Sequence, residues 1–179
     1  KEVEKLGRYD GALNLARAFN QEGVVNEPKL KDDAVRALAR AVGFAKPRAP
    51  SWTVAWLSGI LHQQQNNHKA AEQNFRDVLD SKTQEMVDRG FDFSLDYRVR
   101  VMLAQTLFDQ ARGVRLDEPP ADPAALKKYE QRKTARTAYL DAAVVEVKKA
   151  LQGDPENFRA HYLLSQVYKE LTNADLDRK

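Results

Sequence analysis

Cysteine is missing from this sequence of 179 residues. Its absence excludes disulfides, thiolate zinc sites and haem attachment through CxxCH motifs within the chain. Long hydrophobic runs are missing too: each apolar stretch is soon interrupted by charge, so the sequence predicts no membrane span. A large excess of one charge is also missing, because 29 Lys and Arg face 26 Asp and Glu, for a net charge of +3. So small a net charge does not by itself indicate nucleic acid binding.

Motifs of catalysis are absent as well. The sequence shows no Ser-His-Asp order, no Gly-rich phosphate loop, no HExxH motif and no shielded pair of carboxylates. His62 and His68 are six residues apart and do not share a helix face, which makes them a poor metal pair. His161 stands where a bulky packing side chain is expected. We therefore predict no enzymatic activity, no catalytic residue and no metal site.

Helix-favouring residues dominate what is present. Glycine numbers only 8, sustained apolar and polar alternation is scarce, and Ala, Leu, Gln, Glu, Lys and Arg abound. These features predict an all-α fold. The 42% hydrophobic and 31% charged residues are typical of a folded, soluble chain. The length suits one domain or a short array of repeats.

Small and large residues recur at fixed helical offsets along the chain. Around Gly59 the pattern continues without a gap through Ala71, Phe75 and Val78. The same offsets recur on both sides of Pro155, in Ala143, Val147, Ala150, His161, Leu164, Ser165 and Tyr168. Small residues let two antiparallel helices approach, while large ones fill the gap to the next helix pair.

These offsets resemble the 34-residue tetratricopeptide repeat over about three and a half units. The resemblance implies a solenoid of antiparallel helix pairs with one overlong helix, as a single array over residues 1–179. The expected units are about 9–48, 52–85, 97–157 with an insertion, and a partial unit at 158–179, and the insertions lie at 86–96 and 113–135. We expect the array to continue beyond both ends of this sequence.

In this family the first helices of successive units line a concave groove, and the resemblance implies which side chains face it. Amides, arginines and a few aromatics at these places suit binding of an extended peptide or loop. The expected groove residues are Asn14, Arg17, Gln21, Trp56, Gln63, Gln64, Arg98, Gln105, Asp109, Arg159, Tyr162 and Gln166, alongside Leu13, Ile60, Val101 and Glu170. Leu13 and Arg17 replace the lysine and asparagine of carboxylate-clamp members, so chaperone C-termini are not the expected ligand.

Two insertions interrupt the repeat period. The first places Phe91 and Phe93 in a connector, where they either pack back onto the solenoid or contact a partner. The second begins with prolines and then offers Asp122 as an N-cap and Pro123 at the first helical position, which predicts one long helix over about 123–152. Its early turns carry a run of cations that is either a solvated face or a site for an acidic partner: Lys127, Lys128, Arg132, Lys133 and Arg136.

Four stretches resemble more narrowly the tetratricopeptide tails of bacterial multihaem c-type cytochromes. They are "YDGALNLARAFNQEG", "PSWTVAWLSGIL", "RGFDFSLDYRV" and "DPENFRAHYLLSQVYKEL". This resemblance implies an exported protein, periplasmic or extracellular, with haem on an attached or partner cytochrome and no cofactor within this chain. A cytoplasmic location stays open.

The function expected from the sequence is a non-catalytic protein-protein interaction scaffold, associated with an exported multihaem cytochrome or electron-transfer assembly. Self-assembly through open solenoid ends is a further expectation. The alternative is a basic-helix module that binds nucleic acid or another anionic polymer.

Overall fold

Helix-favouring residues are abundant, and most of the chain is helical. The structure is a computed structural model, and it describes residues 2–25, 30–46 and 49–176. Side chains at 2–6, 9, 20–25, 31, 85 and 173–176 lie outside this description. No strand occurs in the described residues, so the predicted all-α fold class is confirmed over them. The chain divides into two units, Lys1–Ser81 and Lys82–Lys179, and each is described by itself.

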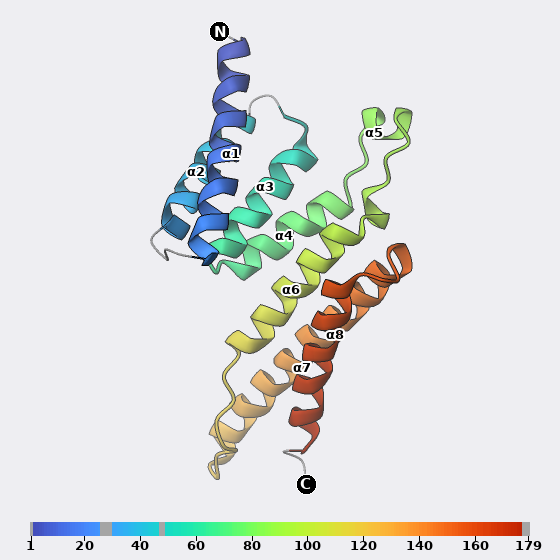
Figure 1. Cartoon of the computed structure of the whole chain (residues 1–179). Helices are drawn as coiled ribbons and strands as arrows, with labels where there is room; N and C mark the ends of the chain where they lie inside the picture. The colour runs from blue at the N-terminus through green and yellow to red at the C-terminus, as the bar shows by residue number, and fades with distance from the viewer. Residues whose placement is uncertain (1, 26–29, 47–48, 177–179) are drawn as a thin grey trace. The chain divides into compact units, whose positions relative to one another are not determined.

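Unit 1 consists of α1 (Glu2–Val25), α2 (Leu30–Ala45), α3 (Ser51–Gln64) and α4 (His68–Leu79) (Figure 1). Each of these helices packs against the next one along the chain. Aliphatic side chains from α1, α2 and α3 form the core of the unit, and they include Ala16, Leu38, Val42, Leu57 and Leu61.

The hairpin of α3 and α4 closes through a short turn at residues 65–67. Asn66 has a φ of 57°, a left-handed conformation that asparagine adopts more readily than most residues. The side chain of Asn67 then caps α4 by accepting a hydrogen bond from the Ala70 amide, 3.4 Å away. Further along the hairpin, Gly59 faces the fully buried ring of Phe75, and a Cβ at Gly59 would lie 2.6 Å from its Cε1 atom. Gly59 therefore lets the two helices approach closely.

Unit 2 consists of α5 (Gln84–Asp88), the 3₁₀ turn η1 (Phe93–Leu95), α6 (Tyr97–Gly113), α7 (Pro123–Gly153) and α8 (Phe158–Leu176) (Figure 1). α6 packs along α7, and α8 packs on α7 and also touches α6. Fully buried aliphatic side chains fill the space between the three helices, among them Leu103, Leu107, Leu140, Val147 and Val167.

The long helix begins where the sequence predicts. Asp122 caps α7 by accepting a hydrogen bond from the Ala125 amide at 2.8 Å, and Pro123 occupies the first helical position. The helix then runs to Gly153, so the prediction of one helix over about 123–152 is confirmed. Whether the units form a tetratricopeptide solenoid stays a prediction. None of the described helices is long and apolar enough to cross a membrane.

Candidate interaction surfaces

The groove residues predicted in unit 1 lie on α1 and α3, but several of them serve packing. Trp56 is half-buried, and its ring lies 5.6 Å from that of Phe75. Leu13 and Ile60 also pack against the core of the unit. These three side chains are therefore largely committed to the fold rather than to a ligand.

The polar members of the same predicted groove are more accessible. Asn14 and Arg17 are exposed on α1, and the Arg17 guanidinium lies 3.4 Å from the Asn14 side-chain oxygen. Gln64 is exposed at the end of α3, while Gln63 is half-buried. The side chain of Gln21 lies outside the described residues.

In unit 2 the predicted groove residues of α6 follow one side of the helix. Arg98 is exposed, while Gln105 and Asp109 are half-buried and joined by a 3.1 Å hydrogen bond that the Gln105 amide donates. Val101, expected in the groove, is instead buried with 4% exposure. The exposed and half-buried groove residues of α6 are thus polar, and Arg98 is the most accessible of them, at the start of the helix.

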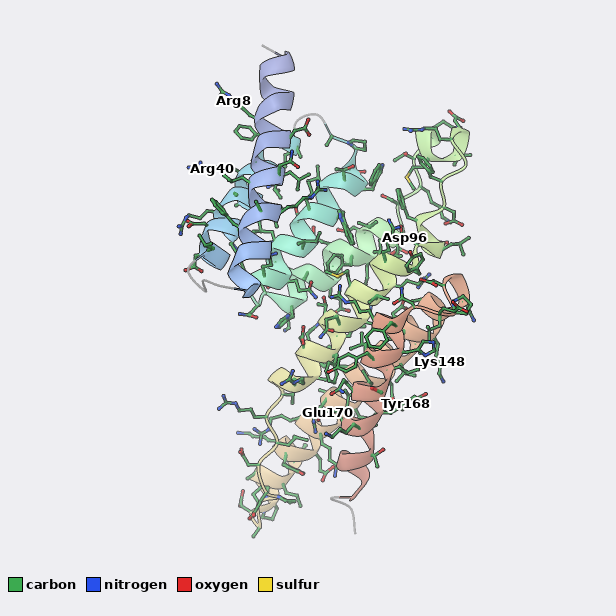
Figure 2. The ribbon with its side chains drawn as sticks, in the orientation of Figure 1. Arg8, Arg40, Asp96, Lys148, Tyr168 and Glu170 are labelled. Carbon is green, nitrogen blue, oxygen red and sulfur yellow. The ribbon has the colours of Figure 1, made fainter. Side chains whose placement is uncertain are left out.

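On α8, Arg159 and Tyr162 are exposed and Gln166 is half-buried. Glu170, also expected in the groove, is half-buried and forms an ion pair with Arg136 of α7 (Glu170 is labelled in Figure 2). His161 and Tyr168, which the sequence assigns to packing, are exposed, because no described element covers that side of α8. His161 instead makes a 2.8 Å hydrogen bond from its Nε2 atom to the Pro155 carbonyl oxygen.

The connector between α4 and α6 exposes several large apolar side chains. Val87, Phe91 and Leu95 are 65%, 45% and 72% exposed. The Phe91 ring lies 6.3 Å from the half-buried Phe93 ring, and the Arg89 guanidinium lies 4.8 Å above the centre of the Phe91 ring. Neither of the two phenylalanines is buried in a core, so the connector presents an apolar surface to solvent.

The connector surface, as we call residues 87–98, also includes the start of α6. A depression of about 410 Å³ is lined by Gly90, Phe91, Asp92, Phe93, Leu95, Asp96, Tyr97 and Arg98. The Arg98 guanidinium packs on the Tyr97 ring and donates a 3.3 Å hydrogen bond to its hydroxyl oxygen, which raises the pKa of Arg98. The fold therefore joins Arg98 from the predicted groove with Phe91 and Phe93 from the first insertion.

Arg100 fastens the connector to the rest of unit 2. Its guanidinium donates hydrogen bonds to the Ser94 carbonyl oxygen, one of them at 2.9 Å, and to the Glu146 carboxylate of α7 at 2.5 Å. The Arg100 and Glu146 side chains are 14% and 9% exposed, and Lys149 also contacts Glu146 at 3.0 Å. This mostly buried ion pair therefore ties the connector at Ser94 to α7.

Acidic side chains of the connector are used to cap its own turns. Asp92 accepts the Ser94 amide at 2.9 Å, and Asp96 accepts the amides of Arg98 and Val99 at 2.8 and 3.2 Å. The hydrogen bonds from Ser94 lower the pKa of the Asp92 carboxyl, with smaller contributions from Lys82 and Arg100. Both carboxylates thus serve local structure, and the Asp96 charge also helps to raise the pKa of Arg98, which stays exposed at this end of α6.

The predicted basic run on α7 does not form one continuous cationic face. Lys127, Lys128 and Arg132 are exposed. Lys133 is half-buried, with its ammonium 5.9 Å from the centre of the buried Tyr129 ring. Arg136 is occupied by its ion pair with Glu170, and both side chains are mostly buried.

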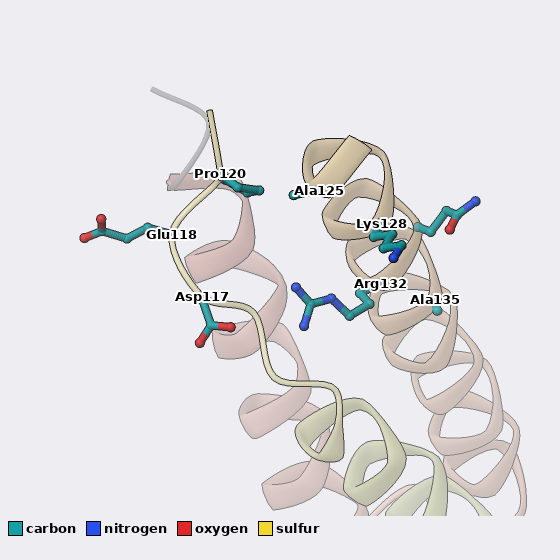
Figure 3. Close-up of a pocket in the computed structure, with 8 residues that line it drawn as sticks. Asp117, Glu118, Pro120, Ala125, Lys128, Arg132 and Ala135 are labelled. Carbon is teal, nitrogen blue, oxygen red and sulfur yellow. The ribbon is translucent and has the colours of Figure 1, made fainter. Parts of the chain in front are cut away.

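Two of the three exposed cations, Lys128 and Arg132, also have acidic neighbours. Figure 3 shows Lys128 and Arg132 on α7 across a cavity from the loop that carries Asp117 and Glu118. The cavity has a volume of about 780 Å³, and Glu118 points away from it (Figure 3). Because both acidic and basic side chains surround the cavity, the positive electrostatic potential here is weaker than the basic run alone suggests.

Among the described residues, no group of three or more histidines and carboxylates is placed to hold a metal ion. The Nδ1 atoms of His62 and His68 are buried, and neither has a hydrogen-bond partner among the side chains and backbone that the structure describes. Two imidazole nitrogens without a third ligand do not define a metal centre.

Three surface residues escaped the sequence analysis: Val87, Leu95 and Tyr97. Apolar side chains next to the acidic residues of a short connector are a signal that is visible in the sequence: Val87 precedes Asp88, and Leu95 and Tyr97 flank Asp96. The role of Arg100 had no such signal, because its partner Glu146 is 46 residues away along the chain.

No protein-family model, no curated protein and no solved structure matches the chain. The described residues form an all-helical fold whose connector exposes apolar side chains and is tied to α7 through Arg100. The function is inferred from these surfaces.

Proposed function

We propose that the chain is a non-catalytic protein-binding module and that the connector surface receives the partner. The observation that carries this proposal is the exposure of Val87, Phe91 and Leu95 on a connector held in place by Arg100. Exposed apolar side chains on a rigid support are characteristic of binding sites, since little conformational entropy is lost when a partner docks.

The chemistry of the surface favours a particular kind of partner segment. Phe91, Leu95 and Tyr97 offer apolar contact, and Arg98 offers a cation at the edge of the depression. The nearby Asp92 and Asp96 are engaged in capping, and the Asp96 charge also offsets part of the Arg98 charge. A short peptide segment with aliphatic anchors and an acidic residue fits this surface best.

A peptide library displayed on phage and selected on the immobilised protein tests the proposal. Selected peptides should bind the Phe91→Ala and Leu95→Ala variants about 5- to 30-fold more weakly, because each truncation removes about 1–2 kcal/mol of apolar contact. Val145→Ala is the matched control, since Val145 is 48% exposed on α7 of the same unit. Equal binding to all three variants, with unchanged helical circular dichroism, would refute the assignment of the surface.

Nucleic acid binding by α7 is the weaker proposal. Two of the five predicted cations are engaged, by Tyr129 and by Glu170, and two of the remaining three, Lys128 and Arg132, have acidic neighbours. A fluorescent single-stranded oligonucleotide tests this alternative directly. Steeply salt-dependent binding that disappears in a Lys127→Ala, Lys128→Ala, Arg132→Ala variant would favour it over the protein-binding module.

The wider setting that we propose rests on the cytochrome resemblance alone. It is association with an exported multihaem electron-transfer protein, with haem on that protein and not on this chain. The full reading frame of the gene tests the setting: an upstream signal peptide with CxxCH motifs supports it, and a start codon just before Lys1 contradicts it.

A further inference from the structure

A cavity between the start of α7 and the loop that precedes it is a second candidate site, outside the proposed function. The loop at residues 114–122 forms one wall, and the first turns of α7 form the other (Figure 3). The connector surface lies near Gly153, at the opposite end of the same helix. A ligand in the cavity would therefore bind separately from a partner at the connector.

The residues of this region keep the cavity open. Pro119 and Pro120 restrict the loop backbone, so the loop resists collapse onto α7. On the helix, Ala125 and Ala135 are too short to fill the space between the two walls. The volume of about 780 Å³ lies within the range of about 300–1,000 Å³ that is typical of ligand pockets.

Asp117, Lys128 and Arg132 bring three charges to the cavity. Within the part of the chain that the structure describes, none of these three side chains forms an ion pair or a hydrogen bond. Lys128 and Arg132 are four residues apart on α7, a spacing at which two like charges repel each other. A carboxylate between the two cations would offset that repulsion and accept charge-assisted hydrogen bonds from both.

The charges on the two walls have opposite signs. Figure 3 shows Lys128 and Arg132 on α7 and Asp117 on the facing loop. Glu118 points away from the cavity in the same view. A simple anion in the cavity would be repelled by Asp117, and a simple cation would be repelled by Lys128 and Arg132. The cavity is therefore complementary to a ligand that carries one charge of each sign.

Much of the remaining wall is apolar. It consists of Pro120, Ala125, Ala135 and the aliphatic parts of the Lys128 and Arg132 side chains. An apolar segment of the ligand is stabilised against this wall because its surface is removed from water. Since the opposite charges come from different walls, such a segment must separate the two charged ends of the ligand.

We propose that the cavity binds a small zwitterion whose ammonium and carboxylate groups are joined by an aliphatic chain. The carboxylate pairs with Lys128 and Arg132, and the ammonium pairs with Asp117. The chain lies against Pro120 and the two alanines of α7. An ω-amino acid is the simplest molecule with this chemistry. Because the cavity is open and the contacts are few, the dissociation constant is expected to be roughly 1 mM.

Three molecules with chains of equal length separate the roles of the two charges: 6-aminohexanoate, hexanoate and hexylamine. Each is titrated into isotope-labelled protein at neutral pH, and the amide chemical shifts are followed by NMR. 6-Aminohexanoate should shift the amides of Asp117 and of residues 125–135, and it should bind about fivefold more tightly than the other two molecules. Equal affinity for hexanoate or hexylamine, or no shift with 6-aminohexanoate at roughly 20 mM, would overturn the proposal.

Arg132→Gln should weaken 6-aminohexanoate binding about fivefold or more, because it removes one of the two cations. Lys127→Gln is the matched control, since Lys127 is exposed next to Lys128 but does not line the cavity. It removes the same charge and should change the affinity by less than about twofold. Equal weakening by the two substitutions would mean a general effect of net charge and would overturn the proposed site.

Asp117→Asn gives a result that loss of folding cannot imitate. It should weaken 6-aminohexanoate binding about fivefold and strengthen hexanoate binding, because it removes an attraction for the ammonium and a repulsion of the carboxylate. Weaker binding of both molecules, or no change for 6-aminohexanoate, would overturn the pairing with Asp117 and with it the zwitterion. Peptide binding at the connector surface is measured separately with Phe91→Ala and Leu95→Ala, so either result stands without the other.

Discussion

Replacing Gly59 by alanine tests the closest helix contact in unit 1. The added Cβ would lie 2.6 Å from Cε1 and 2.8 Å from Cδ1 of Phe75, well inside van der Waals contact. The Phe75 ring is fully buried and packs on Trp56, so it has little room to move aside. Either the ring or the helix must shift, and both displacements cost packing energy.

The expected magnitude follows from two opposing effects. Overpacking of a filled core costs about 1–3 kcal/mol, and the contact distance argues for the upper part of that range. Alanine in place of glycine within a helix stabilises by about 1 kcal/mol. Gly59→Ala should therefore lower the free energy of unfolding by about 1–2 kcal/mol. Gly43→Ala is the control, because a Cβ there meets nothing within 4 Å, and it should stabilise by about 0.5–1 kcal/mol.

Urea unfolding followed by tryptophan fluorescence measures the difference within unit 1. Both tryptophans of the chain, Trp52 and Trp56, lie in α3, so the signal reports on this unit. Gly59→Ala should unfold at a lower urea concentration than the unmodified chain, and Gly43→Ala at a higher one. If Gly59→Ala is as stable as Gly43→Ala, the close packing of α3 on α4 is not as described and the reasoning fails.

The remaining predictions concern the connector. Arg100→Met should destabilise unit 2 by about 2 kcal/mol, because it leaves the mostly buried Glu146 carboxylate with Lys149 as its only cation. Hydrogen exchange of the variant should show loss of amide protection at residues 93–96. A double variant with Glu146→Leu should recover part of that loss, and no recovery would contradict a direct ion pair. Hydrogen bonds from Ser94 lower the pKa of the Asp92 carboxyl below its ordinary value of 3.8. The Asp92 cap therefore contributes its full stability to the turn at pH values above 3.8 and loses it as the pH falls through the lowered pKa. The Ser94 amide resonance should follow that titration, and Asp92→Asn should abolish it.

Local features of the fold were well predicted from the sequence. Asp122 and Pro123 identify the start of α7, because capping depends on residues within one turn of each other. The offset from Gly59 to Phe75 likewise predicts the contact between α3 and α4, since small and large residues at a crossing are a local pattern.

The candidate surfaces were predicted only in part, because they depend on long-range pairing. Arg136 lies in a basic run in the sequence, but the fold places it against Glu170, 34 residues further on. Trp56 stands at a predicted groove position, yet its ring contributes more by packing on Phe75 than by facing solvent. The helical pattern specifies which side of a helix a residue occupies and not which partner covers that side.

The uninterrupted length of α7 has a consequence for anything bound to unit 2. Its 31 residues span about 46 Å at the rise of an α-helix. The exposed Lys127 and Lys128 lie near its first turn, while a Cβ at Gly153, at its other end, would lie 3.5 Å from the Leu95 carbonyl oxygen of the connector surface. The helix is therefore a spacer of fixed length, and two molecules bound at its ends would be held at a constant separation, whatever their chemistry.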